Sequence, residues 1–160
     1  MKPDDKSECN FKNEGVTVGK AKLTGKIDVI RKQSTNELAI IDYKTGHAMH
    51  NWAPKDPYPK IRAHLYKQQL GLYQLMIQGA AHYKGMTVSE LALQFVEPDE
   101  DGQMIYLTYK PTYEELQRLE QLVGKVWEHI MDLNFPDTSG YSLSLTGVKQ
   151  FEDDLLNDRI

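Results

Sequence analysis

Two strand-like segments joined by a short turn constrain the fold of this chain more than any other feature. Residues 25–30 read GKIDVI and residues 37–44 read ELAIIDYK, and both are rich in β-branched and apolar side chains. Such a composition is typical of strands, and the Ser-Thr-Asn sequence at 34–36 favours a turn. We therefore predict an antiparallel β-hairpin centred on Thr35, in which the numbers of paired residues sum to about 70.

The predicted register brings two carboxylates together. Asp28 and Asp42 lie opposite each other, and Lys44, two residues beyond Asp42, lies on the same face. Directly opposed Cβ atoms are roughly 4.5–5.5 Å apart, so two aspartates there repel each other. A divalent cation removes this repulsion, because Mg²⁺ binds one or two carboxylates together with waters and phosphate oxygens. A lysine beside such a cation can position a water or neutralise a phosphate, which points to metal-dependent phosphodiester chemistry.

Two alternatives to this metal site follow from the same residues. Asp42 and Lys44 can form a solvated ion pair at a strand end, with Asp28 as an exposed neighbour, because surface carboxylates are common. A shift of the register by one residue would also place Asp28 on the opposite face of the hairpin.

The remaining pattern predicts a mixed α/β domain with one central sheet. Helical spacing runs through residues 60–82 and places Leu65, Leu72 and Met76 on one stripe. Further elements are expected as strands at 6–12, 16–31, 88–96 and 103–109, a loop at 45–59, an acidic turn at 97–102, a helix that begins with a Thr112–Glu115 capping box and ends at Phe135-Pro136, and a short final helix at 151–156.

Size, charge and cysteine content limit the class of protein. The 160 residues suffice for one domain with a core. Neither an apolar run of ~18 residues nor a signal-peptide core is present, so we expect no membrane span and a cytoplasmic location. The single cysteine, Cys9, excludes an internal disulfide and a four-cysteine iron–sulfur site built from this chain alone. A net charge of −4 is unlike that of a general nucleic-acid coat protein, so nucleic acid would be handled at a local site or held by another domain.

Three motifs, in order, resemble those of one nuclease family. They are GKID at 25–28, DYKTG at 42–46 and QLGLY at 69–73. This set is similar to the G-x-I-D strand, the D-Y-K-T-G strand end and the Q-x-x-x-Y helix of the RecB-like branch of the PD-(D/E)XK nuclease superfamily, over roughly residues 5–80. The resemblance implies a restriction-endonuclease-like α/β core, in which helices flank a mixed central sheet. It also implies a Mg²⁺- or Mn²⁺-dependent deoxyribonuclease, an exonuclease that acts with a helicase.

The resemblance assigns chemical roles to the end of the second strand. Asp28 and Asp42 would be the acidic metal ligands, and the backbone carbonyl of Tyr43 would complete the protein part of the metal shell. Lys44 would orient the attacking water and steady the charge on the phosphate.

The helix that follows would support this site. By resemblance, Gln69 and Tyr73 would hold the site together and contact DNA. On an ideal helix they share a face with Arg62 and Tyr66, and an arginine, an amide and two tyrosines there suit a phosphate and a base. The alternative is that the two tyrosines are packing residues with a solvated hydroxyl.

The segment before Asp28 departs from the family pattern. Many RecB-like nucleases carry a histidine or glutamate on an upstream helix, but only 27 residues precede Asp28. Glu8 is the candidate there for an additional metal contact, with a place on an edge strand as its alternative. We therefore expect the C-terminal part of a larger helicase–nuclease, with a nuclease core at residues 1–136 and a tail carrying a short helix at residues 137–160.

Other functions remain open on the sequence alone. A nuclease-like fold can be a catalytically inactive DNA-binding or scaffold module of a helicase complex, although the intact Asp28, Asp42 and Lys44 set argues against it. An unrelated phosphate-handling enzyme with a carboxylate–metal site is the third reading. The expected partners are single-stranded DNA or a duplex end, together with helicase domains of the same or a partner polypeptide.

The loop after the second strand holds further candidates. His47 and His50 in this loop and His64 on the helix are potential metal ligands, with exposed loop histidines as the alternative. Trp52 can stack on a base or pin the loop to the core, and packing is the expectation we adopt.

Overall fold

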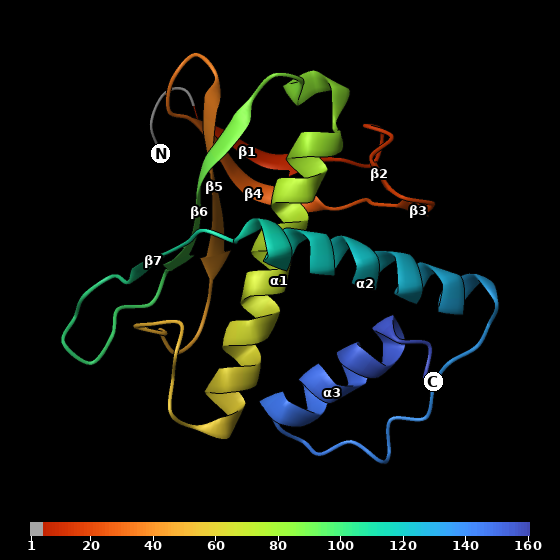
Figure 1. Cartoon of the computed structure of the whole chain (residues 1–160). Helices are drawn as coiled ribbons and strands as arrows, with labels where there is room; N and C mark the ends of the chain where they lie inside the picture. Colours follow the sequence, from red (N-terminus) through yellow and green to blue (C-terminus); the bar gives the residue numbers. More distant parts are fainter. Residues whose placement is uncertain (1–4) are drawn as a thin grey trace.

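One mixed sheet forms the centre of the molecule. The computed structural model describes residues 5–160, and its five main strands lie in the order β1-β4-β5-β6-β7 (Figure 1). β5 and β6 run parallel, whereas the other neighbours are antiparallel. β2 and β3 form a separate two-stranded ribbon. The strand bounds are Asp5–Asn10 for β1, Thr17–Val18 for β2, Ala21–Lys22 for β3, Lys26–Lys32 for β4, Glu37–Lys44 for β5, Thr87–Phe95 for β6 and Tyr106–Tyr109 for β7.

Three helices flank this sheet. α1 (Pro57–Gly79) connects the parallel strands β5 and β6, as a parallel pair requires. α2 (Tyr113–Met131) and α3 (Leu145–Leu156) pack against α1 and against each other, and a single 3₁₀ turn, η1, follows α1 at Ala81–Tyr83. The fold is therefore the mixed α/β class that the sequence predicts. Within residues 5–160, no helix has both the length and the apolar composition needed to cross a membrane.

The capping box at the start of α2 is confirmed. The Thr112 hydroxyl accepts a hydrogen bond from the backbone N–H of Glu115, and the Glu115 carboxylate accepts one from the backbone N–H of Thr112. The helix ends at Met131, four residues before the predicted end at Phe135. Leu133 has a φ of 51°, in the left-handed region, and this conformation does not continue a right-handed helix.

α1 begins at Pro57 and buries only part of the predicted stripe in the core. Prolines in the first turn suit a helix start, because the N–H groups there have no partner within the helix. Met76 of this stripe lies in the core, whereas Leu72 is half-buried in the groove beside α2 and α3 and Leu65 is 51% exposed. The buried side chains of α1 that belong to the main core are Ala63, Leu70, Tyr73, Met76 and Ile77.

Two glycines allow elements to approach α1 closely. A Cβ atom at Gly71 would lie 2.7 Å from Leu119 of α2, closer than real Cβ contacts. A Cβ atom at Gly25, just before β4, would lie 3.3 Å from Met76 of α1. The glycine of the first motif therefore helps to place the start of β4 against the helix that carries the third motif.

Candidate active site

The β4–β5 hairpin has the predicted register. Val29 pairs with Ile41, so the numbers of paired residues sum to 70. Continued by one residue, this register places Asp28 opposite Asp42. The alternative register, shifted by one residue, is wrong.

The ladder between β4 and β5 opens at Asp28. Ile27 and Ile30 belong to the core on the α1 side, whereas Val29 belongs to a separate small cluster. Because side chains alternate along a regular strand, β4 must be irregular at Asp28. The Asp28 carboxylate accepts a hydrogen bond from the backbone N–H of Tyr43 at 2.9 Å. The backbone N–H of Tyr43 therefore donates to a side chain and not to the backbone of β4.

β1 shows a matching irregularity at Glu8. The residues on either side of Glu8 pair with Val29 and Ile27, which leaves Glu8 at the register position opposite Asp28. Its φ of 50° is uncommon for a non-glycine residue. Within the described part of the chain, no three His, Cys, Asp or Glu side chains gather into a group that could hold a metal ion. The proposed metal contact of Glu8 therefore stays a prediction.

Asp42 is a buried carboxylate with one incompletely satisfied oxygen. Its side chain lies at the end of β5 and the residue is 3% exposed. Oδ1 accepts a hydrogen bond from the Tyr73 hydroxyl at 2.9 Å. Lys44 Nζ lies 2.6 Å from Oδ2 as an ion pair, and Oδ2 has no hydrogen-bond partner. A buried carboxylate oxygen of this kind depends on a nearby positive charge.

The third motif supports both Lys44 and Asp42. Lys44 Nζ donates to Gln69 Oε1 at 2.6 Å, and Gln69 Nε2 donates to the Tyr73 hydroxyl oxygen at 2.9 Å. Burial, together with the adjacent Asp42 carboxylate, raises the pKa of the Tyr73 hydroxyl well above its usual range. Tyr73 therefore remains a donor to Asp42. The chain Lys44–Gln69–Tyr73–Asp42 explains why the motif needs an amide and a tyrosine four residues apart on α1.

Tyr66 and Arg62 lie on the same side of α1, as the helical wheel predicts. Lys44 Nζ is 4.5 Å from the centre of the Tyr66 ring, and the Arg62 guanidinium is 5.9 Å from it. Arg62 donates to the backbone carbonyl of His47 at 3.0 Å, while its buried Nε has no hydrogen-bond partner. Two cationic groups therefore face one ring beside the two aspartates.

The loop residues have structural contacts. Trp52 Nε1 donates to the carbonyl of Thr108 at 2.6 Å, and the Trp52 ring packs on Tyr109. These two contacts attach the loop after β5 to β7, in agreement with the packing role expected for Trp52. His47 and His50 are exposed, as the alternative reading of the loop histidines expects.

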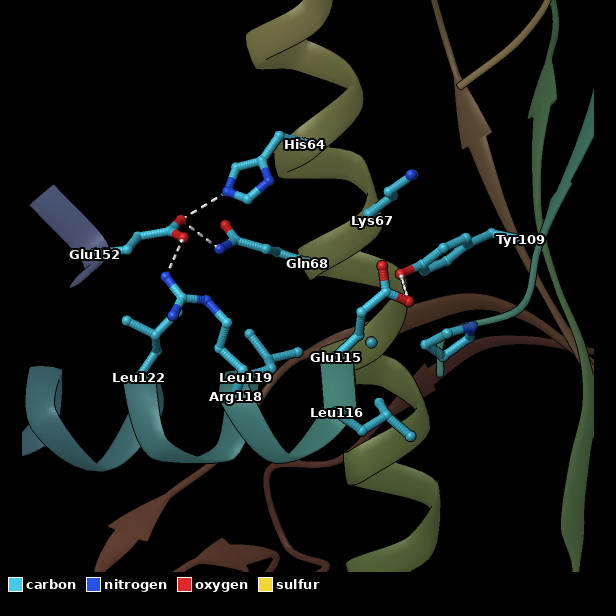
Figure 2. A pocket seen from close by; sticks show the side chains of 12 residues that line it. His64, Lys67, Gln68, Tyr109, Glu115, Leu116, Arg118, Leu119, Leu122 and Glu152 are labelled. Atoms are coloured by element: carbon cyan, nitrogen blue, oxygen red, sulfur yellow. Dashed lines mark hydrogen bonds and ion pairs between the residues drawn. The ribbon is translucent and has the colours of Figure 1, made fainter. Parts of the chain in front are cut away.

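A second polar cluster was missed by the sequence analysis. Glu152 of α3 is 7% exposed, and Figure 2 shows His64 and Gln68 of α1 and Arg118 of α2 pointing toward it. His64 and Gln68 lie 2.6 and 2.7 Å from Glu152 Oε1, and Arg118 lies 3.4 Å from Oε2. We call these four residues the Glu152 cluster. The sequence does contain a signal for this cluster. Glu152 lies between Val148 and Leu155 at helical spacing, so a charged residue interrupts the apolar face of α3.

The charge of Glu152 is stabilised within the protein. Burial alone would raise the pKa of this carboxyl group. The donors of His64 and Gln68 and the positive charge of Arg118 outweigh burial and hold the pKa below its ordinary value. His64 is therefore engaged in a helix contact on another flank of α1 from the Asp42 site.

The two aspartates and the carbonyl of Tyr43 offer the oxygen ligands that Mg²⁺ and Mn²⁺ prefer. Asp42 Oδ2, which has an ion pair with Lys44 and no hydrogen bond, fits such an ion. A mixed sheet with two carboxylates and a lysine at the end of a central strand defines a nuclease-type domain. The family model of the PD-(D/E)XK nuclease superfamily matches residues 3–142, and the chain belongs to this superfamily. Its members are generally nucleases that cleave phosphodiester bonds and typically use divalent metals. No curated protein matches the sequence.

Proposed function

We propose that this chain is a metal-dependent DNA nuclease domain of the RecB-like type, an exonuclease that acts with a helicase. The observation that carries the proposal is the buried Oδ2 of Asp42, which has an ion pair with Lys44 but no hydrogen bond and lies beside Asp28. A buried carboxylate costs stability unless a cation or a donor completes it. Lys44 supplies such a cation, and a bound metal ion would supply one at the same oxygen.

Three groups would hold the metal ion. They are the carboxylates of Asp28 and Asp42 and the backbone carbonyl of Tyr43, and Glu8 is the candidate for a further contact. A bound Mg²⁺ or Mn²⁺ supplies a Lewis acid for the phosphate and lowers the pKa of a water. Tyr73 holds Oδ1 of Asp42, so the ion would bind at Oδ2 and replace the Lys44 ammonium there.

Lys44 would act on the reacting phosphate. Its ammonium is held by Gln69 and lies at the same strand end as the two aspartates. In this position it would orient the attacking water and neutralise charge that develops on the phosphate oxygens. Its side chain is 15% exposed, so the charge acts where little water screens it.

Arg62 and Tyr66 would contact the DNA strand. The planar fork of the Arg62 guanidinium suits a phosphate, while Tyr66 offers its ring to a base. The net charge of −4 agrees with a domain whose main DNA contacts lie in associated helicase domains. We propose that residues 1–136 are the nuclease core and that residues 137–160 are the tail that packs on it.

Cleavage of labelled single-stranded DNA and of duplex ends in Mn²⁺ tests the proposal. We expect wild type to cut and the Asp42→Asn and Lys44→Met variants to lose cleavage. Asp101→Asn and Lys84→Met change the same residue types at exposed positions and serve as controls that keep activity. If wild type cuts and both site variants cut equally well, the reaction takes place elsewhere in the protein.

A second candidate is a catalytically inactive DNA-binding or scaffold module of a helicase complex. It is favoured by the Lys44–Asp42 ion pair, since an ammonium at 2.6 Å already neutralises the carboxylate. Titration calorimetry with Mn²⁺ separates the two functions. Absence of Mn²⁺ binding by wild type, with DNA binding intact, selects the module. Binding that disappears in Asp28→Ala selects the nuclease.

A further inference from the structure

The ammonium of Lys44 has three neighbours of different chemical kinds. Asp42 Oδ2 is anionic and lies 2.6 Å away. Gln69 Oε1 is a neutral acceptor, also at 2.6 Å, and the Tyr66 ring presents its π face at 4.5 Å. Only the first of these contacts competes with a cation for the same oxygen.

A cation bound by Asp42 would deprive Lys44 of its negative partner. The ammonium must then be held by neutral groups, or it will compete with the cation for Oδ2. An amide oxygen and an aromatic face both attract an ammonium, and the attraction of the ring grows when the pair is partly desolvated. Tyr66 precedes Gln69 by three residues on α1, so both present their side chains to Lys44 from one side of the helix.

We infer that Tyr66 is a positioning residue for Lys44. Its ring and Gln69 Oε1 form a seat that holds the ammonium beside Asp42 without requiring the Asp42 charge. The seat follows from the described contacts, and its consequence for metal binding rests on the proposed function. Tyr66 itself need not touch the reacting phosphate for this role.

Mn²⁺ affinity, measured by titration calorimetry, tests the consequence for metal binding. Without the ring, Lys44 depends more on Asp42 and competes with the ion, so Tyr66→Leu should raise the Kd for Mn²⁺ by about two- to fivefold. Tyr66→Phe keeps the ring face and should bind like wild type. Tyr58→Leu removes a tyrosine of α1 that is 73% exposed and is the matched control.

The Lys44→Met background shows whether the ring acts through the lysine. There Tyr66→Leu should leave the Kd unchanged, because no ammonium remains to be held. If Tyr66→Leu raises the Kd for Mn²⁺ equally in both backgrounds, the ring supports the site only through packing and the inference is overturned. An unchanged Kd in the background that keeps Lys44 overturns it as well.

NMR of the metal-free protein tests the seat without any variant at Tyr66. In protein labelled with ¹³C-lysine, the ε-methylene signal of Lys44, identified by its absence in Lys44→Met, should be shifted upfield by the ring. Tyr66→Phe should keep this shift. A Lys44 signal at the position of exposed lysines overturns the inference, even if Tyr66→Leu fails to fold. An upfield signal in a protein that binds no Mn²⁺ supports the seat and overturns the proposed function.

Discussion

Asp42 and Glu152 are the two charged residues among the described ones that are buried as whole residues, and both contact α1. They differ in how their oxygens are satisfied. Both oxygens of Glu152 have donors from the protein, supplied by His64, Gln68 and Arg118. Asp42 has one hydrogen bond from Tyr73, and its other oxygen faces the ammonium of Lys44 without a hydrogen bond.

This difference separates a structural carboxylate from a site carboxylate. The donors of Glu152 come from α1 and α2 while Glu152 itself lies on α3, so the cluster joins three helices. Both of its oxygens are bound by these donors. Asp42 is placed beside a second aspartate at an opening in the sheet, and its Oδ2 is held by the ion pair with Lys44 alone. Burial alone would have ranked the two residues as equals.

The largest expected effect is on cleavage by Asp42→Asn. An amide is a poor metal ligand, so we expect a loss of about 10³-fold or more in the Mn²⁺-dependent rate. The free energy of unfolding, measured by urea denaturation, should change by no more than about 1 kcal/mol, because the Asn amide oxygen still accepts from Tyr73, Gln69 still holds Lys44, and the repulsion between the two aspartates is relieved. Strong destabilisation in this variant would instead put Asp42 in the same class as Glu152.

The next effect is on stability, through Glu152→Ala. Removal of the carboxylate leaves the donors of His64 and Gln68 without an acceptor, and we expect a loss of about 3 kcal/mol in the free energy of unfolding. Mn²⁺ affinity, measured by calorimetry on the folded protein, should stay unchanged. Lys149→Ala, at an exposed position of the same helix, is the control and should cost far less. If Glu152→Ala keeps its stability but loses Mn²⁺ binding, Glu152 is a site carboxylate and not a structural one.

The parts of the molecule that could be predicted are those set by local sequence. The register of the β4–β5 hairpin follows from the turn at Thr35, and its continuation by one residue places Asp28 opposite Asp42 without knowledge of the remaining chain. The capping box of Thr112 and Glu115 is likewise complete within four residues. Pattern and spacing are enough where the interacting groups are neighbours in the sequence.

The parts that could not be predicted depend on contacts between distant segments. Glu152 can act as an acceptor only when α3 packs on α1, and Glu152 is 84 positions from Gln68 in the sequence. The exposure of Leu65 depends on which helices cover each flank of α1, and periodicity does not contain that information. The opening of the sheet at Asp28 comes with an irregularity of β1 at Glu8, which no local signal marks.

The smallest effect is the pH dependence of the Glu152 contribution. The pKa of Glu152 is lowered in the folded protein, so the stabilisation is present above the ordinary glutamate pKa of about 4.3 and is lost as pH falls through the folded pKa. The effect is smaller than that of truncation, because Glu152→Gln keeps the side-chain volume and an acceptor oxygen. We expect the difference in free energy of unfolding between wild type and Glu152→Gln to be constant from pH 7 to about pH 5 and to narrow in more acidic solution. Urea denaturation of both proteins across this range measures it, and the titration of groups that do not contact Glu152 cancels in the difference. If this difference in free energy of unfolding already narrows between pH 7 and 5, the titrating group is not Glu152. If the difference is unchanged at pH 2, the charge of Glu152 contributes nothing to its helix contact.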